Sequence, residues 1–299
     1  MNGVSVRFWL RWSLRDLRAR WVAVLAIAVV IAIGTGVYAG LSSTSTWRRL
    51  SNDASFASTN VHDLRVTASP GVFLHEGELV EVVRSIPSAG QVAAAVERIV
   101  VDSQVEVTTP DGAVLVTARI VGGTLGSDAV DRVWVRDGVV PDPGSGRVVL
   151  EAKFADFHRL ATSGTLVLAG AQTVAYSGVG VGPEEFYVAG PEGTVMAEAD
   201  LATVYGHLVD AQELIGRADV VNDVVITVAP GADVSLVASE LRRAAAGVAG
   251  AGLTVTDVDD VEAVRVLYED IDNDQQFFTA FAVLVLVAAA LAAFNLVNR

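Results

Sequence analysis

Two long, uncharged and apolar runs stand near the two ends of the 299-residue chain, and a segment of ordinary globular composition separates them. The first run covers residues 21–41 and the second covers residues 277–297. Each has about the 20 residues that an α-helix needs to cross a hydrocarbon layer roughly 30 Å thick. The pattern predicts two transmembrane helices with a folded domain between them.

The charges beside the first run predict its orientation. Five arginines precede it, against one acidic residue, Asp16. Because Lys and Arg close to a membrane span stay in the cytoplasm, we expect a cytoplasmic N-terminus and an extracytoplasmic domain at residues 42–276, in a plasma or inner membrane. A cleavable signal peptide is the alternative, although the apolar stretch of such a peptide is shorter, about 7–15 residues.

Two features next to or inside the first run suggest contacts. Residues 1–20 form an amphipathic pattern that predicts a helix in the cytoplasmic interface, with arginines on one stripe that either anchor it or meet a cytoplasmic partner: Arg7, Arg11, Arg15 and Arg18. Within the run, Ala32, Gly36 and Gly40 form a ridge of small residues that permits close helix packing in lipid, unless Gly and Ala are simply common in this chain.

Between the two runs, segments in which apolar and polar residues alternate as in a strand are followed by segments with the apolar spacing of a helix. A strand at 61–67, a helix at 76–86 and a hairpin at 101–121 come first, and short strands follow at 148–150, 165–168 and 173–176. Near the end a strand at 223–228, a helix at 234–245 and a strand at 253–258 repeat the opening order.

A nine-residue pattern, D-x-x-[VI]-T-x-[SA]-P-G, occurs at 63–71 and again at 223–231. A single match of this length can arise by chance, but both copies open a strand–helix–strand unit, which favours duplication. We therefore predict an α+β fold in which units 61–121 and 222–258 pair, with residues 122–220 as an inserted β-rich subdomain.

The second apolar run continues a helical pattern from the domain. No Gly or Pro occurs between residues 261 and 297, and Asp259 or Asp260 can cap the start. Residues 259–276 are thus predicted to form a stalk helix, with Val264, Tyr268 and Ile271 on one face. An unbroken stalk would couple motion on the two sides of the membrane.

The charge excludes one class of partner. The chain has a formal net charge of −14, and every acidic residue except Asp16 lies beyond residue 50. Such a domain repels nucleic acid and anionic headgroups. Cysteine is absent, so the fold has no disulfide and the chain has no thiol chemistry.

Patterns that carry chemistry are incomplete. Residues 270–274 read D-I-D-N-D, but a calcium loop needs Gly at its sixth position and Glu at its twelfth, where Gln275 and Phe281 stand. The four histidines show no metal-ligand spacing and are expected as single surface side chains. There is no P-loop and no nucleophile elbow. The sequence predicts no catalytic residue, no metal and no cofactor, and hence no enzyme.

Taken together, these features resemble the FtsX-like, MacB-type permeases of ABC transporters. V-V-L-E-A-K-F at 148–154 with G-T-L-V-L at 164–168 is similar to a recurring segment of that family, and so is G-V-G-P-E-E-F-Y at 180–187. Residues 278–298 resemble the family's first membrane helix after the outer domain. The order and spacing of these segments carry the resemblance.

The resemblance implies a permease subunit that works by mechanotransmission, with a lipid, lipoprotein, peptide or drug as its substrate. The implied partners are a separate cytoplasmic ATP-binding subunit, a second permease copy or half, and the lipid bilayer. Members of the family usually continue with a cytoplasmic loop and two more spans, so we expect this chain to be the front part of a longer permease. The alternatives are a two-pass sensor or receptor with an extracytoplasmic ligand-binding domain, and an envelope scaffold without transport.

Overall fold

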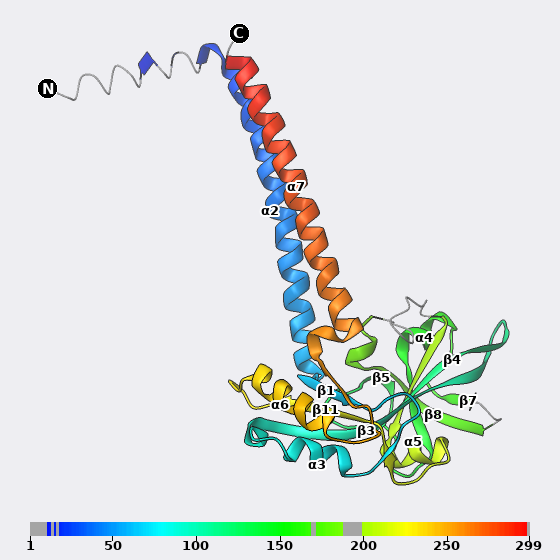
Figure 1. Ribbon diagram of the computed structural model, residues 1–299. Coiled ribbons are helices and arrows are strands. Elements are labelled where there is room, and N and C mark those ends of the chain that lie inside the picture. The colour runs from blue at the N-terminus through cyan, green and yellow to red at the C-terminus, as the bar shows by residue number, and fades with distance from the viewer. Residues whose placement is uncertain (1–10, 13–14, 16–17, 169–171, 188–198, 298–299) are drawn as a thin grey trace. The chain divides into compact units, whose positions relative to one another are not determined.

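A computed structural model describes residues 11–12, 15, 18–168, 172–187 and 199–297 (Figure 1). The chain divides into two compact units: Met1–Asn52 with Tyr268–Arg299, and Asp53–Leu267. Arg7 and most of the predicted interfacial helix at 1–20 lie outside the described residues.

Two long helices carry the apolar runs. Helix α2 is Trp21–Ser58 and helix α7 is Glu262–Val297, and both contain a stretch long and apolar enough to cross a membrane. Little of either stretch is buried, with Ile33 58% and Leu284 68% exposed, so neither is the core helix of a soluble domain. Helix α2 does not end after residue 41, because the polar residues 42–58, which contain no Gly or Pro, continue it.

The two helices lie side by side in the first unit (Figure 1). Their close approach is at Gly34, where a Cβ atom would lie 3.0 Å from Cγ1 of Val285. The predicted small ridge does not make this contact: nothing lies within 4 Å of a Cβ placed at Gly36 or Gly40, and Ala32 is exposed. The ridge faces away from α7, because Gly34 and Val285 already occupy the contact side.

Ion pairs join the polar ends of the same two helices. Arg48 contacts Asp270 at 2.5 Å and Asp274 at 2.7 Å, and Arg49 contacts Asp272 at 2.5 Å. The Arg49 guanidinium also lies 5.5 Å from the ring centre of Tyr268. The acidic residues of the incomplete calcium pattern are therefore ion-paired on a helix.

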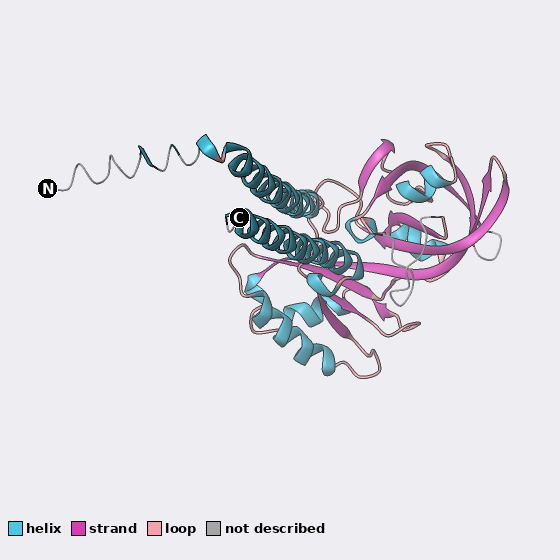
Figure 2. Ribbon diagram, turned by 90° about the horizontal axis from the view of Figure 1, so that it is seen from above, coloured by secondary structure: helices cyan, strands magenta, loops and turns pink. Residues whose placement is uncertain are grey.

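The second unit begins with an α/β layer. Its strands are β1 (Leu64–Thr67), β3 (Val92–Thr109), β11 (Asp223–Val228) and β12 (Thr254–Asp257), in the order β12-β1-β11-β3. Helices α3 (Glu78–Arg84) and α6 (Val234–Ala246) follow β1 and β11, and pack on one side of these strands (Figure 2). The strands of the two strand–helix–strand segments, β1-α3-β3 and β11-α6-β12, alternate in the sheet, as in a split βαβ fold. This confirms the predicted α+β class.

The two copies of the nine-residue pattern pair with each other. Strands β1 and β11 run antiparallel, with Thr67 opposite Asp223 and Leu64 opposite Ile226. Each copy ends in a turn whose glycine takes a left-handed backbone, with φ +80° at Gly71 and +81° at Gly231. The repeat in sequence is thus a local twofold repeat in space.

The inserted segment forms a small barrel. Strands β3, β4, β9, β6, β8 and β7 pair in succession, and β7 returns to β3. They are β4 (Gly112–Gly123), β6 (Arg147–Glu151), β7 (Gly164–Leu168), β8 (Gln172–Val181) and β9 (Leu201–His207), with β5 (Trp134–Gly138) added beside β8. Helices α4 (Ala152–Phe157) and α5 (Leu208–Leu214) pack on the barrel, and β2 (Leu74–His75) pairs with β10 (Val220–Val221).

The predicted boundary between the paired units and the insertion was placed too late. From Ile99 onward, β3 pairs with β4, so the hairpin at 101–121 belongs to the barrel. Strand β3 is long enough to serve both parts, since residues 92–98 pair with β11 in the α/β layer. Asp259 and Asp260 also differ from expectation: they lie in a 3-10 turn, Val258–Asp260, ahead of α7.

Each part has its own core. Leu64, Ile226, Leu79 and Leu241 are buried between the strands and helices of the α/β layer. The core of the barrel contains Ile99, Val105, Leu150 and Leu166, together with Phe154 of α4.

Gly122 on β4 provides a test of the barrel packing. A Cβ atom there would lie 2.2 Å from the Ala211 Cβ and 2.7 Å from the Ile99 Cγ2. We expect Gly122→Ala to lower the free energy of unfolding by about 1–3 kcal/mol through overpacking. Thermal unfolding followed by circular dichroism measures this, with Gly90→Ala as the control because nothing lies within 4 Å of its Cβ. Equal melting temperatures for the two variants would contradict the predicted packing.

Candidate functional site

A buried cluster of charged side chains joins the α/β layer to the barrel. At its centre, Arg98 of β3 lies directly opposite Asp223 of β11 in the strand register. The side chains of Arg98 and Asp223 are 6% and 0% exposed. Both point away from the helices of the α/β layer, because the residues next to them face those helices: Val224 lies in the core of the layer, and Glu97 accepts hydrogen bonds from the Gly77 and Val80 N–H groups.

Arg98 contacts three carboxylates from three parts of the chain. Its Nε donates to Asp223 Oδ1 at 2.6 Å, its Nη1 to Asp131 Oδ2 at 2.7 Å, and its Nη2 to Glu184 Oε1 at 2.8 Å. Asp131 lies between β4 and β5, and Glu184 lies in the 3-10 turn Pro183–Glu185 after β8. One guanidinium therefore binds the α/β layer and two segments of the inserted subdomain.

Arg65 of β1 closes the cluster. Its Nε donates to Asp223 Oδ2 at 2.5 Å and its Nη1 to Glu184 Oε2 at 3.0 Å, while the Thr67 hydroxyl donates to Asp223 Oδ2 at 3.1 Å. Glu184 and Asp223 are thus each held between two arginines.

The electrostatics follow from burial and pairing. Burial opposes the charged form of each group, but the partners outweigh it. The pKa of Arg98 is raised well above its usual value by Asp223, Glu184 and Asp131. The pKa of Asp223 is lowered by Arg65 and Arg98, and the pKa of Glu184 is lowered by the same two arginines. All of these groups are charged at neutral pH.

Glu185, next in the chain, behaves in the opposite way. Burial and then the negative charge of Glu184 raise its pKa to about 7. Its Oε2 accepts a hydrogen bond from the Tyr205 hydroxyl at 2.7 Å, and that hydroxyl accepts one from the Gly182 N–H at 3.1 Å. A cavity of about 30 Å³ lies beside these groups, with Arg98 and Asp131 among its lining residues. Its volume is sufficient for water.

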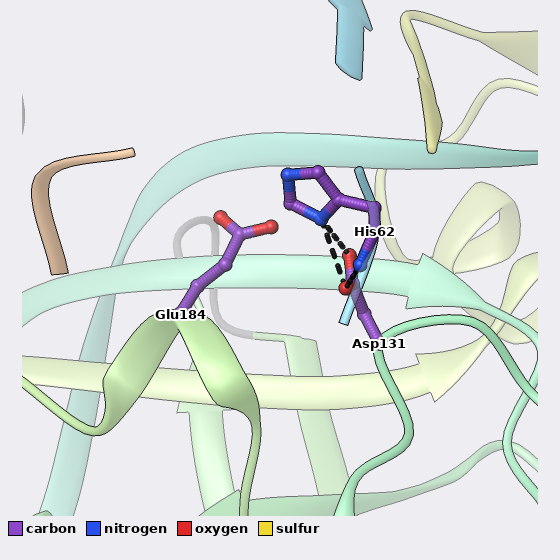
Figure 3. A group of neighbouring side chains, drawn as sticks. All are labelled: His62, Asp131 and Glu184. Atoms are coloured by element: carbon purple, nitrogen blue, oxygen red, sulfur yellow. Dashed lines mark hydrogen bonds and ion pairs between the residues drawn. The ribbon is translucent and has the colours of Figure 1, made fainter. Parts of the chain in front are cut away.

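The same cluster holds the residues that follow α2. His62 is fully buried, and its Nδ1 lies 2.9 and 2.8 Å from the two Asp131 oxygens (Figure 3). Hydrogen bonds from the Asp131 N–H to the Asn60 carbonyl (3.0 Å) and from the Arg132 N–H to the Thr59 carbonyl (2.7 Å) add to this clamp. The Phe56 and Phe186 ring centres are 5.3 Å apart. Our expectation of surface histidines was wrong for His62, because the loop around Asp131 covers it.

His62, Asp131 and Glu184 offer ligand atoms within 4.8 Å of one another, so a metal site has to be considered (Figure 3). His62 Nε2 is buried without a hydrogen-bond partner among the described residues. Both carboxylates, however, already bind the Arg98 guanidinium, and Glu184 also binds Arg65. Two guanidinium groups at this point repel any cation, so the residues present do not fit a metal ion.

The site residues predicted from the sequence lie elsewhere. Val264 is 4% and Ile271 1% exposed on α7, and Tyr268 contacts Arg49. Arg11, Arg15 and Arg18 are exposed helical residues. Sequence reasoning missed the charged cluster entirely. Its signals were Arg65 and Asp223, which lie in the two copies of the repeated nine-residue pattern, and Glu184, which lies in the segment 180–187.

The comparisons with known proteins give structural similarity alone. No model of a known protein family matches the sequence, and no curated protein matches it. The structure is similar to the extracellular domain of the noncanonic ABC-type transporter YknZ from Gram-positive bacteria, with 15% identity, a TM-score of 0.43, and coverage of 65% of this chain and 99% of that one. It is also similar to the periplasmic region of MacB from Actinobacillus actinomycetemcomitans, with 9% identity, a TM-score of 0.45, and coverage of 73% and 96%. At these identities the similarity concerns the fold alone.

Arg98 should be the most sensitive position of the cluster. Arg98→Met keeps the length of the side chain but leaves the buried carboxylates of Asp131 and Asp223 and the partly buried Glu184 short of a partner, and we expect a loss of about 3–5 kcal/mol in the free energy of unfolding. Arg136→Met, which breaks ion pairs with the exposed Asp137 and Asp156, should cost at most about 1 kcal/mol. Chemical denaturation compares the two. A loss at Arg98 no greater than at Arg136 would show that the cluster does not hold the parts together.

Glu185 predicts a dependence of stability on pH. Its pKa is about 7 in the folded chain against a usual value of 4.5, so the folded state binds the extra proton between these values. Stability contributed by Glu185 is therefore lost as the pH rises from about 4.5 to about 7. Glu185→Gln should flatten the melting temperature across this range, while Glu213→Gln at an exposed position should leave the slope unchanged. A slope that persists in Glu185→Gln would assign it to another group.

Proposed function

We propose that this chain is the permease subunit of an FtsX-like, MacB-type ABC transporter. In this proposal a separate cytoplasmic subunit binds and hydrolyses ATP, the two apolar helices shift, and the extracytoplasmic domain changes its arrangement to move or extract a substrate. The resemblance of the sequence segments to that family gives the proposal its class. The chain's own residues give it a mechanism.

The single observation that carries the mechanism is the continuity of α7. The helix begins at Glu262, five residues after β12 ends, and runs unbroken to Val297. Its 36 residues span about 54 Å at 1.5 Å per residue, which exceeds the thickness of a bilayer core. A helix without Gly or Pro transmits displacement along its axis with little bending.

The two helices are attached to different parts of the domain. The last turn of α2 and the residues after it bind the inserted subdomain, through Phe186, Asp131 and Arg132. Helix α7 instead continues from β12, an edge strand of the α/β layer. A relative shift of the helices would therefore exert force on the connection between the two parts. This connection is the charged cluster around Arg98.

The membrane contacts follow from this proposal. The N-terminus would be cytoplasmic, with Arg7, Arg11, Arg15 and Arg18 at the inner headgroups or against the ATP-binding subunit. The ridge of Ala32, Gly36 and Gly40 is exposed on α2, so it is free to contact a second permease copy or half. Val264 and Ile271 would fix the stalk by packing.

Purification of the full-length gene product in mild detergent, tagged at its N-terminus, tests the class of function. We expect an ATP-binding subunit with a P-loop to co-purify, and its hydrolysis rate to change when the permease is present. If no such subunit is recovered and a signalling domain belongs to the same polypeptide, the two-pass sensor replaces the permease.

The stalk provides a test of the mechanism. Ile271→Pro with Val264→Gly should break α7, because proline costs about 3 kcal/mol or more inside a helix. ATP binding by the partner should persist, while ATP-dependent movement of the domain is lost. The chain has no native cysteine, so a spin label on Gln104→Cys reports that movement. Ile271→Ala with Val264→Ala keeps the helix and serves as the control. Undiminished movement in the Pro and Gly variant would exclude a relay through α7.

A further inference from the structure

A groove on the α/β layer lies between α3 and the loop after α6. It encloses about 760 Å³, within the roughly 300–1,000 Å³ of sites that bind small molecules. Its floor is apolar and includes Val72, Phe73, Val82 and Val248, each partly exposed. Val72 and Val248 pack against the core of the layer and Phe73 packs against the core of the barrel, so these parts of the floor are held in place from beneath.

The rim of the groove is acidic. Glu76, Glu78 and Glu81 are all exposed and line it, against one described cation, Arg84. Arg84 pairs with Glu81 at 3.0 Å. Glu76 and Glu78 have no cationic partner among the described residues, and Glu78 accepts a hydrogen bond only from the His75 N–H, at 2.9 Å. Negative charge therefore remains at the mouth of an apolar depression.

An aromatic ring of the floor already contacts a cation. The Arg217 guanidinium lies 4.7 Å from the ring centre of Phe73. Aromatic faces attract cations, and the attraction increases when water is excluded. The Phe73 ring therefore already has a cation of this chain beside it, and the groove offers a ligand its apolar floor and two carboxylates that have no cationic partner among the described residues.

We propose that this groove binds an organic cation of drug-like size, whose apolar part lies on the floor and whose charge lies between Glu76 and Glu78. This goes beyond the proposed function, which names no site. It does not depend on that function, since binding requires neither ATP nor an ATP-binding subunit. Either proposal can fail without the other.

Binding of ethidium, an aromatic cation, to the 299-residue chain in phosphatidylcholine nanodiscs tests the proposal by fluorescence polarisation, with empty nanodiscs as the blank. We expect saturable binding that Glu76→Gln with Glu78→Gln weakens about tenfold, as the loss of two Coulombic attractions at a protein surface implies. Glu106→Gln with Glu213→Gln removes two exposed carboxylates of the inserted subdomain and should change the affinity less than twofold. The anion 8-anilinonaphthalene-1-sulfonate should bind at least tenfold more weakly than ethidium.

Val82→Trp provides an independent check, because it fills the groove without changing charge. We expect it to abolish saturable ethidium binding while the melting temperature of the chain stays the same. Binding that survives both Val82→Trp and the Glu76 and Glu78 substitutions would place the dye elsewhere and overturn the proposal. Equal binding of the anion, or no saturable binding of ethidium up to about 1 mM, which corresponds to roughly −4 kcal/mol, would also overturn it.

Discussion

The arrangement of the domain depends on one buried guanidinium. Arg98 stands where β3 passes from the α/β layer to the barrel, and it binds Asp223, Asp131 and Glu184 at 2.6–2.8 Å. Each carboxylate comes from a different segment, so no local interaction could bring them together. Because an uncompensated buried charge is costly, the cluster permits few alternative arrangements of the two parts. Hydrophobic packing alone, which is not directional, would permit more.

This connection differs from an apolar interface in how it could respond to force. Two cores stabilise the α/β layer and the barrel, and the ion pairs of Arg98 connect these parts in addition to Leu208, which packs against both cores. An ion-pair cluster keeps its geometry until its hydrogen bonds break, and then it exposes charges that water can solvate. Glu185 and the water-sized cavity lie beside it. Under the proposed mechanism, a displacement of the helices would exert force on this connection.

The sequence predicted a helix or strand well where one periodicity of apolar and polar residues ran through the whole segment. The strands, the α/β units and the unbroken α7 follow from alternation, helical spacing and the absence of Gly and Pro. The hairpin was assigned to the wrong part because β3 carries one continuous pattern through both sheets. The charged cluster was missed because Arg65 and Asp223 alternate with apolar residues, as they would on a solvated strand face. Nothing in the strands themselves says that Glu184 and Asp131 will cover that face.

The sequence by itself determined that two apolar helices flank an acidic α+β domain, and that the domain contains a repeated unit. Those properties depend on local periodicity and composition, which each segment carries alone. Only the tertiary structure decided that the two repeats pair strand against strand, that His62 is buried, and that Gly34 rather than Gly36 or Gly40 meets α7. Those outcomes depend on which distant segments share a face, because burial and close approach are properties of pairs of elements.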